Sequence, residues 1–282
     1  MIIKKITLAC FIALLIFSFA NGQETEEKKP EYGWKNEGVA GLNFTQNKFD
    51  NWSQGGEDSW SWQLDVNTKF VNDQEKFNWS NSIKISYGKT KVGDSGARKA
   101  ADEIKLESVY TYKLNHYVNP YAAATGLTQF TDGYDYGQDP KVKISGFLDP
   151  GYFTQSAGIG YEPNAHIKSR LGAALKETIT KSDTAAIIYA DGEENRVEYG
   201  MESVTDISYK FNEILLYTSK LELFSNLNRI DEIDVTWDNL ISAKLSKYLT
   251  ASLNVKLFYD KDISTRRQLK QTLAVGLSYT LF

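Results

Sequence analysis

Apolar and polar residues alternate with a period of two along most of this chain. Residues 60–67 read Trp-Ser-Trp-Gln-Leu-Asp-Val-Asn, and residues 273–281 place Leu, Val, Leu, Tyr and Leu at every second position. A period of two puts the apolar side chains on one face of a β-strand and the polar ones on the other. Outside the N-terminal segment no stretch shows a convincing helical period, so the pattern predicts an all-β protein.

About twelve such segments follow one another, and they are long compared with the usual strand of about 5 or 6 residues. Ten residues at a tilt near 45° span roughly 23 Å, about the height of the apolar band of an outer-membrane barrel. The segments at 118–130 and 151–161 contain Ala and Gly and alternate poorly. The predicted strands are 38–47, 59–71, 76–89, 103–114, 118–130, 151–161, 165–180, 196–210, 213–225, 233–246, 249–259 and 270–281.

The links between the segments alternate between short and long. Every second link is short, at 72–75, 115–117, 162–164, 211–212 and 247–248, whereas the links at 47–58, 90–102, 131–150 and 181–195 are longer and rich in Gly, Asp and Lys. Membrane barrels have short periplasmic turns and long outer loops, whereas a soluble sandwich has no reason to sort its links in this way. An even strand count would place both termini on the periplasmic side.

These signals predict one transmembrane, antiparallel, up-and-down β-barrel of about twelve strands, with apolar side chains facing lipid. The alternative is a soluble barrel or sandwich with the same apolar faces turned inward. Aromatic residues near the segment ends favour the membrane, because such rings prefer the membrane–water interface. These residues are Trp60, Trp62, Phe77, Trp79, Tyr110, Tyr112, Tyr199, Tyr209, Tyr259 and Tyr279.

The N-terminus has the layout of a secretory signal peptide. Lys4 and Lys5 precede an apolar run over 6–20, and Ala20-Asn21-Gly22 offers small residues before a cut ahead of Gln23. We therefore expect a signal peptide at 1–22, a polar periplasmic lead-in at 23–36 and the barrel at 37–282. Cleavage would remove Cys10, the only cysteine, so the exported chain would have no disulfide.

Composition narrows the possible functions. A mean hydropathy of -0.41 excludes a bundle of transmembrane helices, and a net charge of -4 gives no basic surplus for nucleic acid. We expect no cofactor and no metal site, because the chain has only two His and one Cys. The acidic residues of two loops lack the spacing of a calcium loop: Asp132, Asp135 and Asp139, and Asp191, Glu193 and Glu194.

If the apolar face points outward, parity assigns charged residues of both signs to the lumen. We expect the basic residues of 165–180 to pair with the acidic residues of the neighbouring strand at 196–210. The mixed signs predict either a narrow polar channel without strong ion selectivity or a lumen closed by ion pairs. The predicted lumen residues are Asp65, Lys69, Lys84, Lys105, Glu107, Lys168, Arg170, Lys176, Glu198, Glu202, Asp206, Lys220, Glu222, Asp234, Asp238, Lys244 and Lys256.

Short motifs near the start of the predicted barrel and at Phe282 resemble those of known proteins. Residues 41–46 (Gly-Leu-Asn-Phe-Thr-Gln) and 51–56 (Asn-Trp-Ser-Gln-Gly-Gly), followed by the strand from Ser59, resemble the opening of an uncharacterised family of exported Bacteroidota β-barrel proteins. The resemblance implies an outer-membrane barrel and supplies no activity and no functional residues. Phe282 after an alternating strand resembles the terminal signal read by the barrel assembly machinery, although Tyr279 and Leu281 lie on the opposite parity from the common pattern.

The sequence leaves three functions open. The first is a passive channel or small-solute transporter in the outer membrane, with membrane lipid and the assembly machinery as its partners. The second is a non-conducting barrel whose outer loops bind an envelope partner or surface polymer, through Tyr134, Tyr136 and Phe147. A lipid hydrolase is a minor third, because the only bases of the usual type, His116 and His166, lie at short turns. We therefore expect no enzyme.

Overall fold

The computed structural model describes residues 32–51, 53–54, 56–181, 184, 192–230, 232–264 and 266–282. The predicted signal peptide and most of the lead-in lie outside this part of the chain. No helix among the described residues has the length and apolar character needed to cross a membrane. Twelve strands close into one barrel, which confirms the predicted fold. They are β1 (Gly33–Asn47), β2 (Ser59–Asp73), β3 (Phe77–Val92), β4 (Arg98–Tyr112), β5 (Val118–Thr128), β8 (Gly151–Asn164), β9 (Ile167–Ile179), β10 (Asn195–Lys210), β11 (Leu215–Asn226), β12 (Ile233–Lys244), β13 (Leu249–Tyr259) and β14 (Gln268–Thr280).

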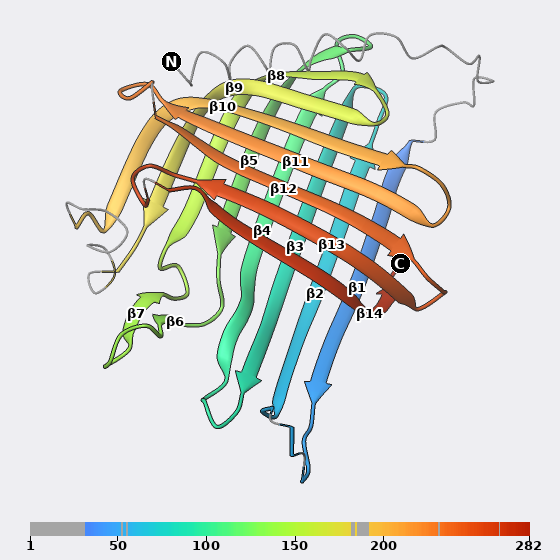
Figure 1. The fold of residues 1–282 in the computed structure, drawn as a ribbon. Helices are drawn as coiled ribbons and strands as arrows, with labels where there is room; N and C mark the ends of the chain where they lie inside the picture. The colour runs from blue at the N-terminus through green and yellow to red at the C-terminus, as the bar shows by residue number, and fades with distance from the viewer. Residues whose placement is uncertain are drawn as a thin grey trace, which may run out of the picture. The chain divides into compact units, whose positions relative to one another are not determined.

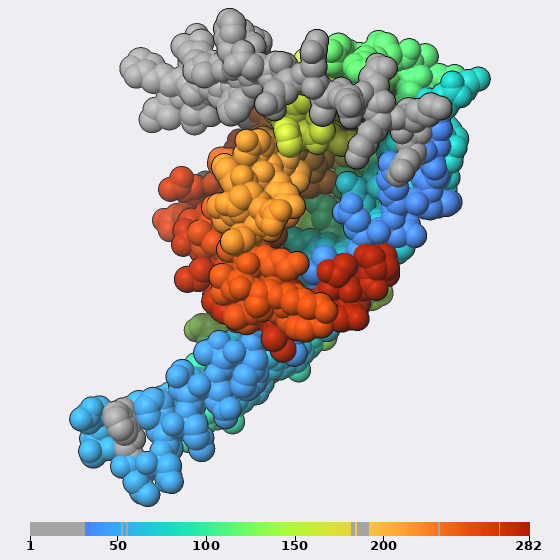
Figure 2. Space-filling model, turned by 90° about the vertical axis from the view of Figure 1, so that its right-hand side faces the viewer, coloured from blue at the N-terminus to red at the C-terminus, as the bar shows by residue number. Residues whose placement is uncertain are grey.

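The ring has up-and-down topology. Each strand pairs antiparallel with the next barrel strand along the chain, and β1 closes the ring against β14 (Figure 1). We call one end of the barrel the turn end, because it carries the short links at 74–76, 113–117, 165–166, 211–214 and 245–248. The other is the loop end. Figure 2 faces the turn end of β10 to β14 and shows a recess between these strands and β1.

Two details of the loop end differ from the prediction. The link between 131 and 150 contains a small hairpin, β6 (Gly133–Asp135) and β7 (Val142–Ser145), whose strands are too short to show alternation. The link predicted at 90–102 is only 93–97, because β3 and β4 both extend farther toward the loop end. A β-bulge between Gly88 and Lys89 shifts the pairing there and hides the end of β3 from a strict period-two pattern.

The barrel is apolar outside and charged inside. Large apolar side chains are exposed on its outer surface, among them Leu273 at 78%, Ile159 at 59% and Leu171 at 53%, whereas the buried residues include Arg170, Lys176 and Glu202. A soluble barrel buries its apolar face and exposes its charges. The reversed arrangement is that of a membrane-spanning barrel, in which ring closure also satisfies the backbone hydrogen bonds that lipid cannot.

Aromatic side chains cluster near both ends of the outer surface. At the turn end Trp34 lies 6.1 Å from Trp79, and Phe77 stacks on Tyr110 at 5.5 Å between ring centroids. Near the loop end the ring of Tyr87 lies 5.7 Å from that of Trp62. Two aromatic zones separated by an apolar band are typical of a barrel anchored at both membrane–water interfaces.

Small residues on β8 and β9 make room for one large inward side chain. Tyr121 is 5% exposed, and it pairs with Gly158, which in turn pairs with Gly172 on the far side. A Cβ atom at Gly172 would lie 2.6 Å from the Tyr121 hydroxyl and 2.3 Å from the carbonyl oxygen of Ala157. The weak alternation of β5 and β8 therefore reflects packing under a tyrosine ring.

We expect Gly172→Ala to destabilise the barrel by about 1–3 kcal/mol, because the new methyl group has no space. Gly160→Ala is the matched control on the same wall, since its Cβ would meet its nearest neighbour at 3.5 Å. The measurement is the temperature at which the refolded barrel loses its fast migration on an unboiled gel. Equal midpoints for the two variants would contradict the packing argument.

Candidate functional site

Ion pairs join opposite walls of the barrel directly. Lys105 on β4 donates to Glu222 on β11 with 2.6 Å between Nζ and Oε1, although the two strands are five places apart on the twelve-strand ring. Lys84 on β3 reaches Asp238 on β12 at 3.0 Å, and Lys256 on β13 reaches Glu103 on β4 at 2.6 Å. These three pairs connect the wall of β3 and β4 to the wall of β11 to β13 across the lumen.

Glu107 connects three strands in the same layer. Its carboxylate accepts a hydrogen bond from Arg170 on β9 at 2.6 Å and one from Lys220 on β11 at 2.5 Å. The side chains of Glu107 and Arg170 are 11% and 9% exposed. A nearly buried carboxylate needs such partners, because an unpaired buried charge is very costly.

We call this layer the central belt. Arg170 also lies 3.9 Å from Glu202, whose other contact is the hydroxyl of Ser156 at 2.6 Å. The belt has five cations and five carboxylates, and at its edge Asp206, 3.6 Å from Lys220, adds a sixth carboxylate. Its members are Lys84, Lys105, Arg170, Lys220 and Lys256, and Glu103, Glu107, Glu202, Glu222 and Asp238.

Strand periodicity explains how this belt is assembled. Glu103, Lys105 and Glu107 occupy every second position of β4 and therefore point to the same side of the sheet. The flexible four-carbon stem of lysine lets a charge on one wall reach a carboxylate on the other. Each lysine of the belt contributes both an inward apolar stem and a terminal donor.

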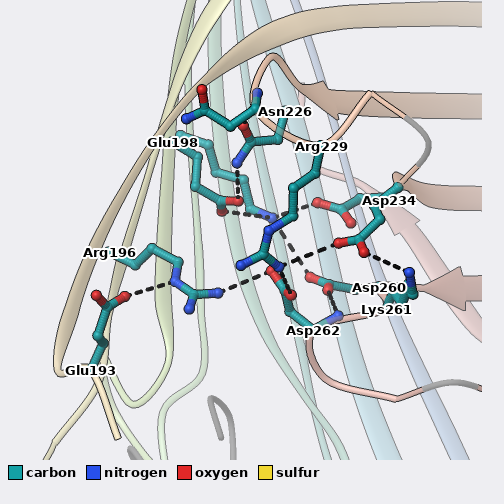
Figure 3. A network of polar contacts seen from close by, with 12 residues as sticks. Glu193, Arg196, Glu198, Asn226, Arg229, Asp234, Asp260, Lys261 and Asp262 are labelled. Atoms are coloured by element: carbon teal, nitrogen blue, oxygen red, sulfur yellow. Dashed lines mark hydrogen bonds and ion pairs between the residues drawn. The ribbon is translucent and has the colours of Figure 1, made fainter. Parts of the chain in front are cut away.

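A second group of charges lies near the loop end (Figure 3). Lys176 on β9 is 2.7 Å from Asp234 on β12 and 3.6 Å from both Glu198 and Asp260. One buried ammonium group therefore faces three carboxylates. Further cations nearby balance the excess negative charge of this cluster.

These further cations come from the loop end of β10 and from two outer links. Asp262 accepts from Arg196 at 3.0 Å and from Arg229 at 2.8 Å, while Glu232 pairs with Arg229 and Lys261. The contacts join the links at 180–194, 227–232 and 260–267, because Arg196 also bonds Glu193 at 2.8 Å. We call these residues, with those around Lys176, the loop-end network. The cavity that they enclose is about 10 Å³, space for roughly one water molecule.

The structure places most of the predicted lumen residues in these two layers. Lys84, Lys105, Glu107, Arg170, Glu202, Lys220, Glu222, Asp238 and Lys256 lie in the central belt, and Lys176, Glu198 and Asp234 lie in the loop-end network. Asp65 accepts hydrogen bonds from Gln63 and Ser86 and has no cation partner among the described residues.

Four residues of the prediction lie outside the two layers or at their edge. Lys168 pairs with Glu162 at 3.0 Å at the turn end, where both side chains are exposed. Asp206 is 43% exposed and lies 3.6 Å from Lys220. Lys69 and Lys244 are exposed, and Lys244 is the last residue of β12.

The predicted pairing between β9 and β10 holds only in part. Lys176 does lie opposite Glu198, but its shortest contact is to β12, and the shortest contact of Arg170 is to β4. Lys168 is opposite Asp206 in register, yet its ion pair is with Glu162. Pairing across the lumen is shorter than pairing along the wall, because a side chain that points inward can approach the far wall end to end.

Sequence reasoning missed several members of the network. Glu103 shares the parity of Lys105 and Glu107, so the alternation could have identified it. Asp260 and Asp262 lie in the link after β13, where no periodic signal exists. Their role depends on how three loops meet, which a pattern along one chain does not contain.

The remaining candidate residues have ordinary partners. His166 Nδ1 faces the carbonyl oxygen of Ser208 at 3.1 Å, and the ring of His116 lies edge-on to Tyr117. Asp135 accepts hydrogen bonds from Gly137 and Gln138. Within the described ranges no three His, Cys, Asp or Glu side chains are grouped so that they could hold a metal ion. A hollow of about 330 Å³ at the turn end contains no serine among its lining residues, which are His116, Tyr117, Glu162, Pro163, Asn164 and Ala165.

Asp149 anchors the long loop that carries β6 and β7. Its side chain is fully buried, accepts hydrogen bonds from the Thr184 hydroxyl and the Lys181 amide, and lies 3.4 Å from the ammonium group of Lys143. Burial alone would raise the pKa of Asp149, but these three partners outweigh it and hold the pKa below its ordinary value. The ionised carboxylate therefore fastens this loop to the link after β9.

Comparison with known proteins places part of the chain in context. A family model described as "Protein of unknown function (DUF3078)" matches residues 44–134, about a third of the chain. That region thus resembles an uncharacterised family, as the motifs between 41 and 56 predict. No curated protein sequence shows a significant match.

Solved structures with some likeness are outer-membrane barrels. An outer membrane channel from Pseudomonas putida F1 is 11% identical over 92% of this chain and 99% of that one, with a TM-score of 0.41. The translocator domain of autotransporter NalP from Neisseria meningitidis is 9% identical over 98% and 95%, with a TM-score of 0.39. The KdgM porin is 12% identical over 87% and 99%, with a TM-score of 0.33.

We expect Glu107→Gln to destabilise the barrel by about 3–5 kcal/mol, because it takes from two buried cations, Arg170 and Lys220, the carboxylate nearest to each. Glu162→Gln removes an exposed ion pair at the turn end and should cost about 0–1 kcal/mol. Unfolding of both variants in detergent, followed by tryptophan fluorescence, measures the difference. Equal losses would mean that water already screens Glu107.

Asp149→Asn should speed proteolytic cleavage within 129–150 about tenfold at neutral pH while leaving the barrel intact, since a buried charge-assisted contact is lost. Asp132→Asn is the matched control, because Asp132 also contacts Lys143 but is half exposed. In the wild type the folded pKa of Asp149 is lowered, so its contribution is full above about pH 4 and disappears as the pH falls through the folded pKa. Unchanged cleavage in the Asp149 variant would overturn this role.

Proposed function

We propose that this protein is an outer-membrane channel for small polar solutes that is closed at rest by the central belt. The observation that carries the proposal is the set of direct bonds between opposite walls, such as Lys105–Glu222 and Lys84–Asp238. A permanently sealed barrel can be filled with apolar side chains, which are often at least as stabilising as buried ion pairs. Charged groups, in contrast, can exchange their partners for water when the walls separate.

The balance of charges in the central belt affects which solutes an open channel would select. The five cations of the belt face its five carboxylates and Asp206 beside Lys220, so the charges nearly balance and an open state would select weakly between anions and cations. The same pairs make closure sensitive to ionic strength where water reaches them. We infer a route for small neutral or zwitterionic polar solutes as readily as for ions.

The proposal includes the location. Export by a signal peptide at 1–22, assembly by the barrel machinery and residence in the outer membrane of a bacterium of the Bacteroidota type are parts of it. The outward apolar band and the sorting of long and short links support this location, with the turn end in the periplasm.

In planar bilayers the wild-type protein should be silent or open rarely. Replacing both partners of a cross-barrel pair, as Lys105→Ser with Glu222→Ser, keeps the charge balanced and should produce discrete, reproducible conductance steps. The pair Lys168→Ser with Glu162→Ser is the control, because it removes an exposed ion pair at the turn end. A wild type that is already wide open, or a double variant as silent as the control, would contradict closure by the belt.

A second candidate is a non-conducting barrel that binds a partner or surface polymer through its outer loops. The β6–β7 hairpin favours it, because Tyr136 lies under the guanidinium of Arg98 at 4.7 Å and Tyr134 under the ammonium of Lys141 at 4.2 Å. Phe147, in the same loop, is 51% exposed. Deleting 133–145 should abolish partner capture from envelope extracts while the barrel stays heat-modifiable, and unchanged capture would exclude this hairpin.

A further inference from the structure

The barrel is closed by an unusually short seam. β1 and β14 pair only from Val39 to Leu42 against Thr280 to Leu277, extended by Leu281 donating to the Gly38 carbonyl at 2.7 Å. Every other neighbouring pair in the barrel is in register over at least eight residues. Figure 1 shows the two strands meeting near the C-terminus and diverging toward the loop end.

Both strands continue beyond the seam without a partner on that side. β1 extends through 43–47 and β14 begins at Gln268, which leaves five and nine residues unpaired across the seam. Open sheet edges do not persist against hydrocarbon, because lipid chains cannot satisfy backbone groups. In a membrane this edge must therefore meet something polar.

The sequence permits a longer seam than the one observed. Continuing the register would place Thr45 opposite Ala274 on the inner face, and Phe44 opposite Val275 on the outer face. The pairing stops where Asn43 lies over Gly276, and the two residues are so close that a Cβ at this glycine would be 2.0 Å from Asn43 Oδ1. Glycine at this position gives the Asn43 amide its space.

One lumen cation lies beside the unpaired edge of β14. Lys270 shares the inward parity of Thr272 and Ala274, and its ammonium group donates to the carbonyl oxygen of Ala100 at 3.3 Å. Among the described residues no carboxylate lies within ion-pair distance of it, whereas every cation of the central belt has one. The ammonium group of Lys270 therefore points from β14 into the lumen toward β4, and its remaining donors are free for an acidic group that enters through the unpaired edge.

We propose that this unpaired seam is a lateral binding site for an anionic amphiphile of the outer leaflet. Its phosphate or carboxylate head accepts hydrogen bonds from Lys270 and from unpaired backbone amides of β1 and β14. Its alkyl chains stay in the membrane against Leu273, Val275 and Phe44, which are 78%, 56% and 59% exposed. The site opens through the wall, and Lys270 lies opposite Lys256 of the central belt in the β13–β14 register.

Lipid retention tests the site directly. The refolded protein is placed in vesicles of phosphatidylcholine with a minor share of phosphatidylglycerol, extracted gently and weighed by native mass spectrometry. We expect phosphatidylglycerol to be retained by the wild type, and about tenfold less by Lys270→Gln, because a charge-assisted contact is lost. Lys244→Gln, at an exposed lysine of the turn end, should behave as the wild type.

Equal retention by all three proteins would overturn the proposal, and so would retention of inorganic phosphate supplied in place of the lipid. A mass of two protein chains that disappears with edge substitutions would overturn it as well, since a second copy would then occupy the seam. A properly folded Lys270→Gln barrel, identified by its heat-modifiable migration, is required for each comparison.

A disulfide across the seam gives a second readout. Thr45→Cys with Ala274→Cys places two thiols opposite each other in the continued register, and oxidation should close the seam and abolish lipid retention. Gly41→Cys with Ser278→Cys, at a position that is already paired, should leave retention unchanged. Full retention by the oxidised 45–274 variant would overturn the lateral site.

Discussion

The arrangement of this molecule depends on charges that must pair across a narrow closed ring. A barrel in lipid must turn its apolar face outward, so alternation forces the polar set inward on every strand. With twelve strands the lumen is narrow enough for lysine and arginine to reach the far wall. An inward charge that found no partner would cost several kcal/mol, so these side chains adopt the few conformations in which cations and carboxylates meet.

This constraint links the fold to its proposed use. The central belt draws the wall formed by β3 and β4 toward the wall formed by β11 to β13, as the bonds of Lys84, Lys105 and Lys256 require. The loop-end network adds a second layer that depends on three outer links meeting at Asp262. Closure by ion pairs is compatible with opening, because water can replace each partner as the walls separate. The seam between β1 and β14 is incompletely paired, and the proposed lateral lipid site lies at this seam.

Much of the fold could be predicted from the sequence, because the alternation of apolar and polar residues is a local property that each strand shows in its own residues. The twelve strands agree with the predicted segments except at ends such as Gly33 and Val92, where glycine or a bulge interrupts the pattern. The β6–β7 hairpin was missed since three or four residues are too few to show a period. Parity also placed Lys84, Glu107 and Glu222 among the lumen residues, and the structure brings all three into the belt.

The partners of these residues could not be predicted. Which carboxylate meets Lys105 depends on strand stagger and lumen width, and both are properties of the closed ring. Asp260, Asp262 and Arg229 lie in links without periodicity, and they come together only when three loops converge. The short seam is likewise invisible in the sequence, because the patterns of β1 and β14 are compatible with five further pairs. Pattern determines which side of a strand a residue faces, while the closed ring determines what it touches.

The most direct test of this account is a double-mutant cycle on Lys105 and Glu222, with unfolding followed in detergent. The two residues are on opposite walls and 117 positions apart in the chain, so only a contact across the lumen can couple them. Direct pairing predicts a coupling free energy of about 1–3 kcal/mol between Lys105→Met and Glu222→Gln. A coupling near zero would mean that water separates the walls, and the central belt would then not close the barrel.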